Sequence, residues 1–481
     1  MLAIGLDAAE GSLIRRLADA GELPEIAALI RAGLWSTLRA SELAGSGGIW
    51  PTFVSGRPAP EHGVYGEWVW DPRQMAMRRP RLERLVPLHK THDAPVGMFG
   101  VPAAWPSGRE DGFDVTGWGV HDRWAIDTTI PWPHVTPPHL RPLLGGPHPI
   151  DDAGKLPPRS PEDWDTLADL GRACLEGTRL RGEVAARFLE AARPAIAIVV
   201  FAELHHCVHQ LWHTAEPDHP AFAGLAEMPD EAGPTLLDIL READAQVGRL
   251  AAAVDGPPPV LFSLHGTEAA RGIVNLTDAL LVHHGFAEHH VNKASARGFA
   301  AAVKRRTPRR VKLAWYRRAP RRLTDGVAEL NLQPRYRWDR TRAIALATDQ
   351  HGRIQVNLRG REAHGIVEPR DYPALLDELE ALLAGLTDER GRPLVGGVYR
   401  GGEEGPPERV PDITFAWTEA ASVENLVVRG LPGIHTPRNR EITALHTFEG
   451  FCVVPPEVDP PDVAAGTEQV LGWLLRQGGA C

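Results

Sequence analysis

Cysteine is scarce in this chain of 481 residues, which contains four: Cys174, Cys207, Cys452 and Cys481. They are too few and too scattered for a disulfide framework, so we expect a reduced, cytoplasmic protein. No apolar run approaches the roughly 18 residues that a membrane-spanning helix needs. The first seven residues lack a basic segment and a cleavage site, so no signal peptide is expected.

A basic excess is also missing. The 52 Lys and Arg residues against 62 Asp and Glu residues give a formal net charge of -10. This balance argues against a nucleic-acid polymer as partner, because such a partner selects a basic surface. One stretch, residues 304–322, is strongly basic, and either a solvated helical face or a site for an anionic partner would account for it. The sequence gives no oligomeric state.

Short apolar runs alternate with segments that have the spacing of amphipathic helices. Strands are predicted at residues 1–7, 195–201 and 259–263, a hairpin at 341–358, and helices at 13–30 and 180–192. The run at 195–201 is apolar throughout, as in a parallel strand buried on both faces. The alternation predicts an α/β fold in which helices cover a mostly parallel sheet, with ligands bound beyond the carboxyl ends of the strands.

The richest chemical signal follows the strand at 195–201. Four histidines fall within nine residues, and His205 and His209 would lie one turn apart on a helix. Imidazoles at that spacing suit zinc and similar ions, so the segment favours a metal site. Cys207 lies among them, either as a further ligand or as a small buried hydrophobic residue.

Three other residues are ambiguous when each is taken alone. Asp7 ends the first strand and could cap the following helix or bind a metal. Ser46 lies in a Gly-Ser-Gly-Gly passage, interpreted as a loop that could approach an anion closely. His265 follows a buried strand and precedes Gly266, where a structural role would suffice.

The order of these segments resembles that of the type I phosphodiesterase/nucleotide pyrophosphatase family of the alkaline phosphatase superfamily. The resemblance covers nearly the whole chain. It rests on the segments Ile4–Ala9, Ser46–Gly56, Pro60–Val64, Phe201–Trp212, Phe262–Gly266, Trp338–Ala343, Ile354–Glu362, Gly365–Val367, Pro411–Asp412 and His446–Gly450.

The resemblance implies a site for one or two divalent ions, usually zinc. Residue by residue, it implies metal ligands at Asp7, Ser46, His205, His209, His265 and His446, with Ser46 also the nucleophile. It further implies an alkaline phosphatase-like domain over residues 1–481. Within that domain we expect a cap at 65–190 and a helical, basic insertion at 266–335.

Two positions depart from the family pattern. His205 stands where the family has an aspartate, and it could still bind metal together with His209 and His446. Leu264 replaces the aspartate of Asp-His-Gly, and leucine cannot bind metal, so the site containing Asp7, Ser46 and His265 would hold its ion more weakly. Glu203 is a candidate additional ligand, or a residue that orients a ligand histidine.

The function expected from this resemblance is metal-dependent hydrolysis of a small phosphodiester or pyrophosphate through a phosphoseryl intermediate. A phosphomonoesterase or sulfatase is an alternative, although the sulfatase pattern Cys/Ser-x-Pro-x-Arg is missing at Ser46. Because of Leu264, a metal-poor, non-catalytic protein that binds a phosphorylated ligand or a partner protein is a second alternative.

Overall fold

The structure is a computed structural model of residues 1–481. It describes all of them except 121–131, 154–157, 271–275, 291–306, 308–310, 312–325, 327–328, 330–331, 347–350, 403–404, 422–425, 432–433, 435–441, 462–465 and 479–481. The basic stretch predicted at 304–322 therefore lies almost entirely outside the described residues.

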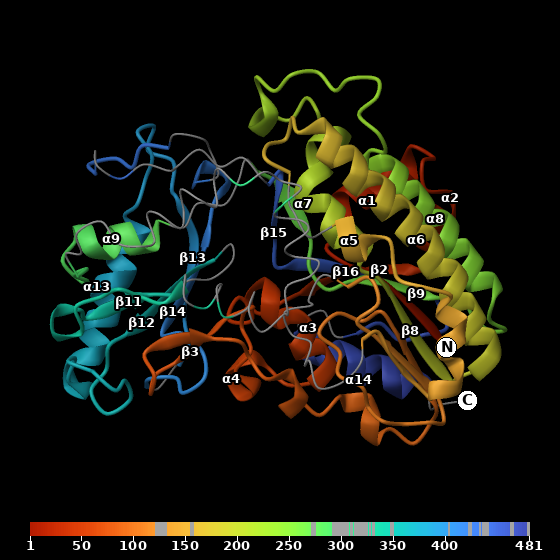
Figure 1. The fold of residues 1–481 in the computed structure, drawn as a ribbon, viewed down its shortest axis with the longest axis horizontal. Coiled ribbons are helices and arrows are strands. Elements are labelled where there is room, and N and C mark those ends of the chain that lie inside the picture. Colours follow the sequence, from red (N-terminus) through yellow and green to blue (C-terminus); the bar gives the residue numbers. More distant parts are fainter. Residues whose placement is uncertain are drawn as a thin grey trace.

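An eight-stranded sheet forms the centre of the larger part of the molecule, on the right in Figure 1. Its order is β2-β16-β9-β1-β8-β5-β6-β7. The strands are β1 (Leu2–Leu6), β2 (Leu34–Arg39), β5 (Val96–Phe99), β6 (Phe113–Thr116), β7 (His134–Thr136), β8 (Ile196–Phe201), β9 (Val260–Ser263) and β16 (Glu449–Val454). The five inner strands from β9 to β6 run parallel, and β2, β16 and β7 are antiparallel to their neighbours. The predicted mostly parallel α/β sheet is confirmed.

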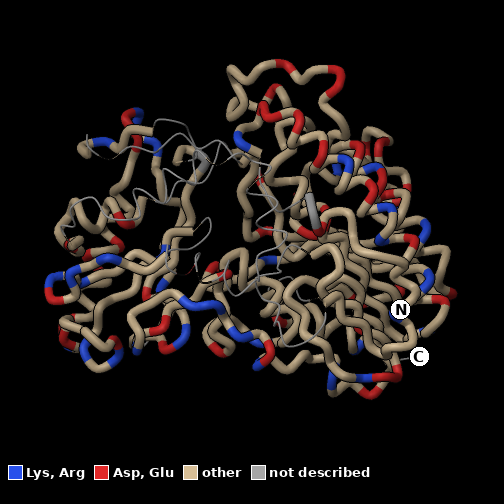
Figure 2. The backbone as a smooth tube through the Cα atoms, viewed as in Figure 1, with Lys and Arg blue, Asp and Glu red and all other residues tan. Residues whose placement is uncertain are grey.

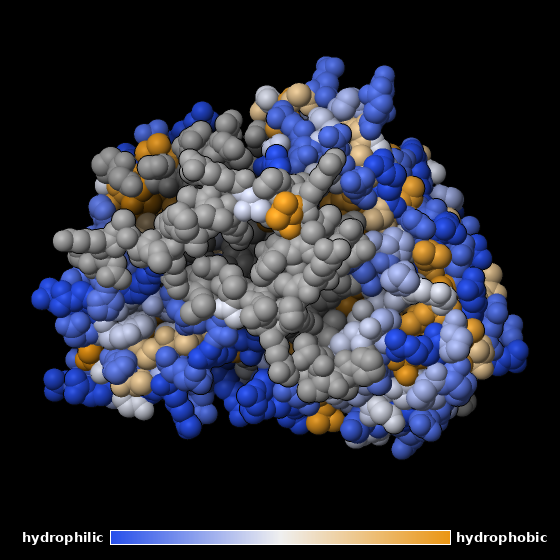
Figure 3. Space-filling model, viewed as in Figure 1, coloured by the Kyte–Doolittle hydropathy of each residue, from blue (hydrophilic) through white to orange (hydrophobic). Residues whose placement is uncertain are grey.

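Helices cover both faces of this sheet. The α-helices in the described part of the chain are α1 (Gly11–Asp19), α2 (Pro24–Ala32), α3 (Gly45–Ser55), α4 (Ala59–His62), α5 (Ile150–Ala153), α6 (Trp164–Ala192), α7 (Glu203–Ala215), α8 (Leu236–Ala252), α9 (Thr277–His283), α13 (Tyr372–Ala384) and α14 (Thr467–Gly478). Of these, α9 and α13 pack against a separate, smaller sheet. On the face seen in Figure 3, hydrophilic side chains predominate over the outer helices.

The central strand β8 shows why the sheet needs two helical layers. Its six residues are all fully or almost fully buried, and alternate side chains point to opposite faces. Ile198 and Val200 join a core with residues of α3 and α14, whereas Val199 and Phe201 join a second core with α6, α7 and α8. Burial on both faces explains the uninterrupted apolar run in the sequence.

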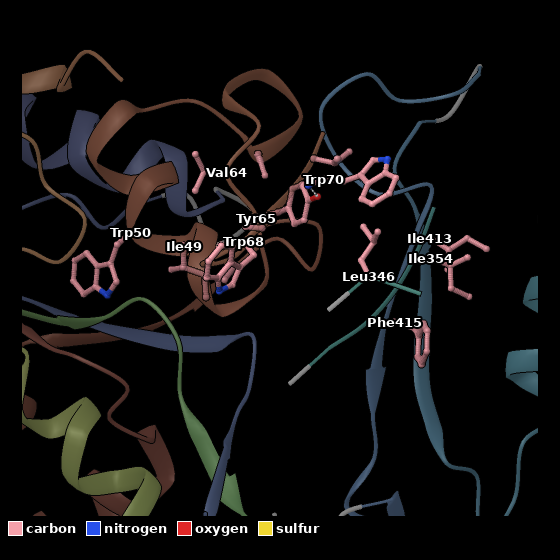
Figure 4. Packing of buried hydrophobic residues seen from close by; sticks show 14 of the residues in the cluster. Ile49, Trp50, Val64, Tyr65, Trp68, Trp70, Leu346, Ile354, Ile413 and Phe415 are labelled. Atoms are coloured by element: carbon pink, nitrogen blue, oxygen red, sulfur yellow. Dashed lines mark hydrogen bonds between the residues drawn. The ribbon is translucent and has the colours of Figure 1, made fainter. Parts of the chain in front are cut away.

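A smaller antiparallel sheet lies on the left in Figure 1, in the order β11-β12-β14-β13. Its strands are β11 (Ala343–Ala345), β12 (Gly352–Val356), β13 (Val395–Arg400) and β14 (Ile413–Trp417). The pairing of β11 with β12 confirms the predicted hairpin. Figure 4 shows that Tyr65, Trp68 and Trp70 lie between α3 and this small sheet, within one continuous hydrophobic core.

The expected cap at 65–190 differs from what the structure places there. This range contains β5, β6 and β7 of the central sheet and α6, which packs against α7 and α8. The hairpin of β3 (Val69–Asp71) and β4 (Ala76–Arg78) forms a separate two-stranded sheet. Among the described residues, no helix is long and apolar enough to cross a membrane.

Candidate functional site

Three of the predicted site residues follow three adjacent strands. Asp7 follows β1, His205 lies in the first turn of α7 after β8, and His265 follows β9. These parallel strands are neighbours in the order β9-β1-β8, so their carboxyl ends meet at one edge of the sheet. The Asp7 carboxylate is fully buried there, with Oδ2 3.6 Å from His205 Nδ1 and Oδ1 3.5 Å from His265 Nε2.

Two further histidines reach the same place from other elements. His209 lies one turn after His205 on α7, and His446 ends β15 (Ala444–His446). The strand β15 pairs with β10 (Thr267–Ala269), opposing His446 to Thr267, just after His265. As a result, the Nε2 atoms of His209 and His446 are 2.9 Å apart.

A backbone carbonyl sets the protonation of His209. The Nδ1 atom lies 2.9 Å from the Ala444 carbonyl oxygen, which can only accept, so Nδ1 carries the proton. The other ring nitrogen, Nε2, is the one that faces His446. Metal-binding histidines are commonly oriented by such a contact at their other nitrogen.

The surroundings also keep His446 neutral. Burial lowers the pKa of His446 well below its ordinary value, and the neighbouring imidazoles of His209, His265 and His205 lower it further. Asp7 acts in the opposite direction, with a smaller effect. A neutral imidazole is the form that binds metal.

The donor set fits a zinc-like ion. One ligand nitrogen from each of His205, His265 and His446 lies within 4.8 Å of the other two. The ring of His209 is 4.4 Å from that of His446 and 4.9 Å from that of His205, centroid to centroid. Around a tetrahedral zinc ion, neighbouring nitrogen ligands are about 3.3 Å apart, so a small closure of this cluster would suffice.

Ser46 lies in the first turn of α3, and not in the loop that its glycine-rich surroundings predict. One turn later on the same helix, Trp50 donates a hydrogen bond from Nε1 to Asp7 Oδ1 at 2.9 Å. Residues four apart lie on one face of a helix, so Ser46 and Trp50 share a face and α3 is fixed directly to Asp7. The structure therefore brings the Ser46 helix to the histidine cluster.

The start of α3 also contacts a buried guanidinium from the small sheet. Arg353 of β12 is fully buried and lies 5.0 Å from the centre of the Tyr65 ring. A Cβ atom at position 45 would overlap the Nη2 atom of Arg353 and lie 3.0 Å from its Cζ, and Gly45 has φ of +54°. Both facts require glycine beside Ser46.

Glu203 is engaged elsewhere. Both of its carboxylate oxygens accept hydrogen bonds from Arg181 Nε, at 2.7 and 2.8 Å, and His148 Nε2 lies 2.9 Å from one of them. All three side chains are buried. Because Arg181 and His148 already bind the Glu203 carboxylate, we do not propose Glu203 as a metal ligand.

Leu264 is fully buried and belongs to the core on the α3 side of the sheet, together with Phe262. The position where the family pattern has a carboxylate is thus part of the apolar packing. The roles of three other groups at the site have no local signature in the sequence. The Trp50 indole and the Ala444 carbonyl become recognisable only once the chain is folded, and so does Arg353.

His62, at the end of α4, makes the stability of the protein depend on pH. Its Nδ1 accepts a hydrogen bond from the Val64 amide at 3.0 Å, and its Nε2 lies 3.0 Å from Thr52 Oγ1. Burial lowers the pKa of His62 to about 4. Between that value and about 6.5 the unfolded chain binds more protons, so the free energy of unfolding should fall as the pH falls, by about 3 kcal/mol in all.

The measurement is guanidinium-induced unfolding at pH 7 and pH 5, on the wild type and on His62→Asn, whose amide oxygen can still accept from Val64. The asparagine does not titrate, so we expect the variant to lose less stability on acidification. Equal losses in the two proteins would refute the assignment to His62.

The mostly parallel sheet, with a carboxylate and imidazoles gathered beyond the carboxyl ends of its strands, defines an alkaline phosphatase-like hydrolase. More closely, the type I phosphodiesterase / nucleotide pyrophosphatase family matches residues 1–443, and the chain belongs to that family. The family is metal-dependent, and the chain is a phosphoric ester hydrolase of the phosphodiesterase/pyrophosphatase type. His446 lies just beyond the matched residues.

Solved structures with a similar fold share little sequence with the chain. Phosphonoacetate hydrolase from Sinorhizobium meliloti 1021, in complex with phosphonoformate, is 12% identical with a TM-score of 0.52, over 99% of this chain and 95% of that chain. Human ectonucleotide pyrophosphatase / phosphodiesterase 5 is 11% identical with a TM-score of 0.46, over 100% and 94%. The likeness to phosphonoacetate hydrolase shows the fold alone. No curated protein matches the chain.

Proposed function

We propose that the chain hydrolyses a small phosphodiester or pyrophosphate, with Ser46 as nucleophile and zinc as the metal. The observation that carries the proposal is the convergence of Asp7 with four imidazoles, from His205, His209, His265 and His446, at one edge of the sheet. We retain the prediction of a cytoplasmic location, which rests on the four scattered cysteines.

The residues that would hold the metal are Asp7 and the four histidines, joined by Ser46. When bound, the ion would lower the pKa of the attacking hydroxyl and neutralise charge on the phosphoryl group. Because Leu264 supplies no carboxylate, we propose one firmly bound ion among the histidines and a weaker second position near Asp7 and His265.

In the proposed mechanism, Ser46 attacks from the first turn of α3. The Oγ atom would form a bond to phosphorus while the leaving oxygen departs with the electrons of the broken ester bond. A water oxygen would then attack the same phosphorus and release Ser46 Oγ, giving back the free enzyme. The amino end of α3 carries a partial positive charge and Arg353 lies beside it, and both favour the negative phosphoryl oxygens.

A second candidate follows from the buried Leu264: a protein that keeps little metal and binds a phosphorylated ligand without turnover. Metal content separates the two, because hydrolysis by the proposed route requires the ion whereas binding alone does not.

The direct test is elemental analysis of protein purified without chelator. We expect about one tightly bound equivalent of zinc in the wild type, with partial occupancy of a second position. His446→Ala should retain at least about tenfold less metal, because it removes a ligand from the middle of the cluster. His289→Ala is the matched control, since His289 is half-exposed and pairs with Asp278 away from the sheet edge. Wild-type protein without metal, or equal metal in both variants, would refute the proposal.

A further inference from the structure

A cavity of about 560 Å³ lies at the far end of α3 from Ser46. The end of α3, the helix α4, the β3–β4 hairpin and residues 79–86 form its walls. We call it the arginine pocket because six arginines line it: Arg57, Arg78, Arg79, Arg81, Arg84 and Arg409. In Figure 2 the backbone is blue at Lys and Arg and red at Asp and Glu.

Positive charge prevails in this pocket although the whole chain carries a net charge of -10. Three carboxylates line it against the six arginines: Glu61, Asp71 and Glu408. Asp71 uses its Oδ1 to accept from the backbone amides of Arg73 and Gln74. The arginine pocket is therefore a local concentration of cations on an acidic molecule.

Three of the arginines are already engaged. Arg78 pairs with Glu329, Arg79 pairs with Glu67 at 3.2 Å, and Arg409 donates to the backbone carbonyl of Glu61. The other three, Arg57, Arg81 and Arg84, are exposed, and their guanidinium groups have no acidic partner within the described part of the chain. These three can turn to a ligand without breaking an ion pair.

The pocket also has an apolar wall. Val69, Trp70, Leu85 and Val86 line it, and Val86 is 60% exposed, one of few large hydrophobic side chains so exposed among the described residues. The Trp70 indole is 9% exposed, and its Nε1 donor is buried with no hydrogen-bond acceptor in the described structure. The ring of Trp70 thus contributes apolar surface to the pocket and not its N–H group.

We propose that the arginine pocket binds a small phosphorylated molecule, its phosphate held by Arg57, Arg81 and Arg84 and its apolar or ring portion against the Trp70 wall. Guanidinium groups bind phosphate through paired charge-assisted hydrogen bonds, and the volume suits a ligand of that size. Ser46 and Ser55 are nine residues apart on α3, about 14 Å along the helix, so this site is separate from the catalytic one. The inference does not depend on the catalytic proposal.

Calorimetry with phenyl phosphate as the probe tests the site, using protein kept in chelator so that metal chemistry contributes nothing. We expect the wild type to bind, and the triple variant Arg57→Gln, Arg81→Gln, Arg84→Gln to bind at least about tenfold more weakly. The matched control replaces Arg31, Arg187 and Arg249 by Gln, because these arginines are also exposed and the change in net charge is the same. Its affinity should equal that of the wild type.

Two further measurements test whether the ring of the ligand lies at Trp70 and whether the phosphate belongs to a small molecule or to a lipid. Binding of phenyl phosphate should quench tryptophan fluorescence in the wild type and much less in Trp70→Phe. Vesicles of equal parts phosphatidic acid and phosphatidylcholine supply the same phosphate chemistry on a lipid. Vesicle binding without phenyl phosphate binding would overturn the small-molecule ligand in favour of a membrane surface. An undetectable affinity in the wild type, or equal losses in both triple variants, would overturn the site itself.

Discussion

Replacing Ser46 by alanine should slow the hydrolysis of bis(4-nitrophenyl) phosphate at least about a thousandfold, with the metal content unchanged within about twofold. Alanine removes the atom that forms the bond to phosphorus in the proposed first step, whereas the imidazole ligands remain. The measurement is the turnover number from nitrophenolate release, with elemental analysis of the same samples. In the wild type, acid quenching during turnover should also trap a phosphate on Ser46, detectable by mass spectrometry.

The matched control is Ser55→Ala on the same helix. Ser55 is buried, and its Oγ donates to the Pro51 carbonyl at 2.7 Å, so its loss should cost about 1 kcal/mol of stability and little activity. A Ser46→Ala protein that kept full turnover would refute the serine nucleophile. Loss of metal together with activity would instead assign Ser46 a ligand role alone.

Replacing Glu203 by glutamine should cost about 3–5 kcal/mol of unfolding free energy. The neutral amide leaves the fully buried Arg181 without its counter-charge, and breaking a buried ion pair on one side is strongly destabilising. Arg181 still donates to the Trp118 and Gly119 carbonyls, which cannot neutralise it. Guanidinium unfolding at pH 7 measures the difference.

Glu183→Gln is the control with the same chemical change on the neighbouring helix α6. Glu183 pairs with Arg179 on the surface at 3.0 Å, and such pairs contribute about 0–1 kcal/mol. Burial alone would raise the pKa of Glu203, but Arg181 and His148 outweigh it and hold the pKa below its ordinary value. The stability that Glu203 supplies is therefore present above its ordinary pKa and lost as the pH falls through the folded value. Equal losses in the two variants would refute the buried pair as a main support.

The strands that meet at the site could be predicted from the sequence because they are buried on both faces. Continuous apolar runs mark β1, β8 and β9 without reference to distant residues. The spacing of His205 and His209 likewise depends only on one helical turn. The predictable features are thus those that depend only on residues close together in the sequence.

The helix α3 could not be predicted in this way. Glycines and the internal Pro51 have low helix propensity, so local sequence favours a loop at Ser46. Burial of Ile49, Trp50 and Phe53 in the core compensates. The contact of Arg353 with Gly45 depends on segments far apart in the sequence, and no local pattern encodes it.

The position of β16 in the sheet has a consequence for synthesis on the ribosome. This strand, near the carboxyl end of the sequence, lies between β2 and β9, so β2 has no neighbour in the sheet until residues 449–454 emerge. His446 emerges just before it. We therefore expect nascent chains to remain open along this edge, with the proposed metal site incomplete, until residues 446–454 have emerged.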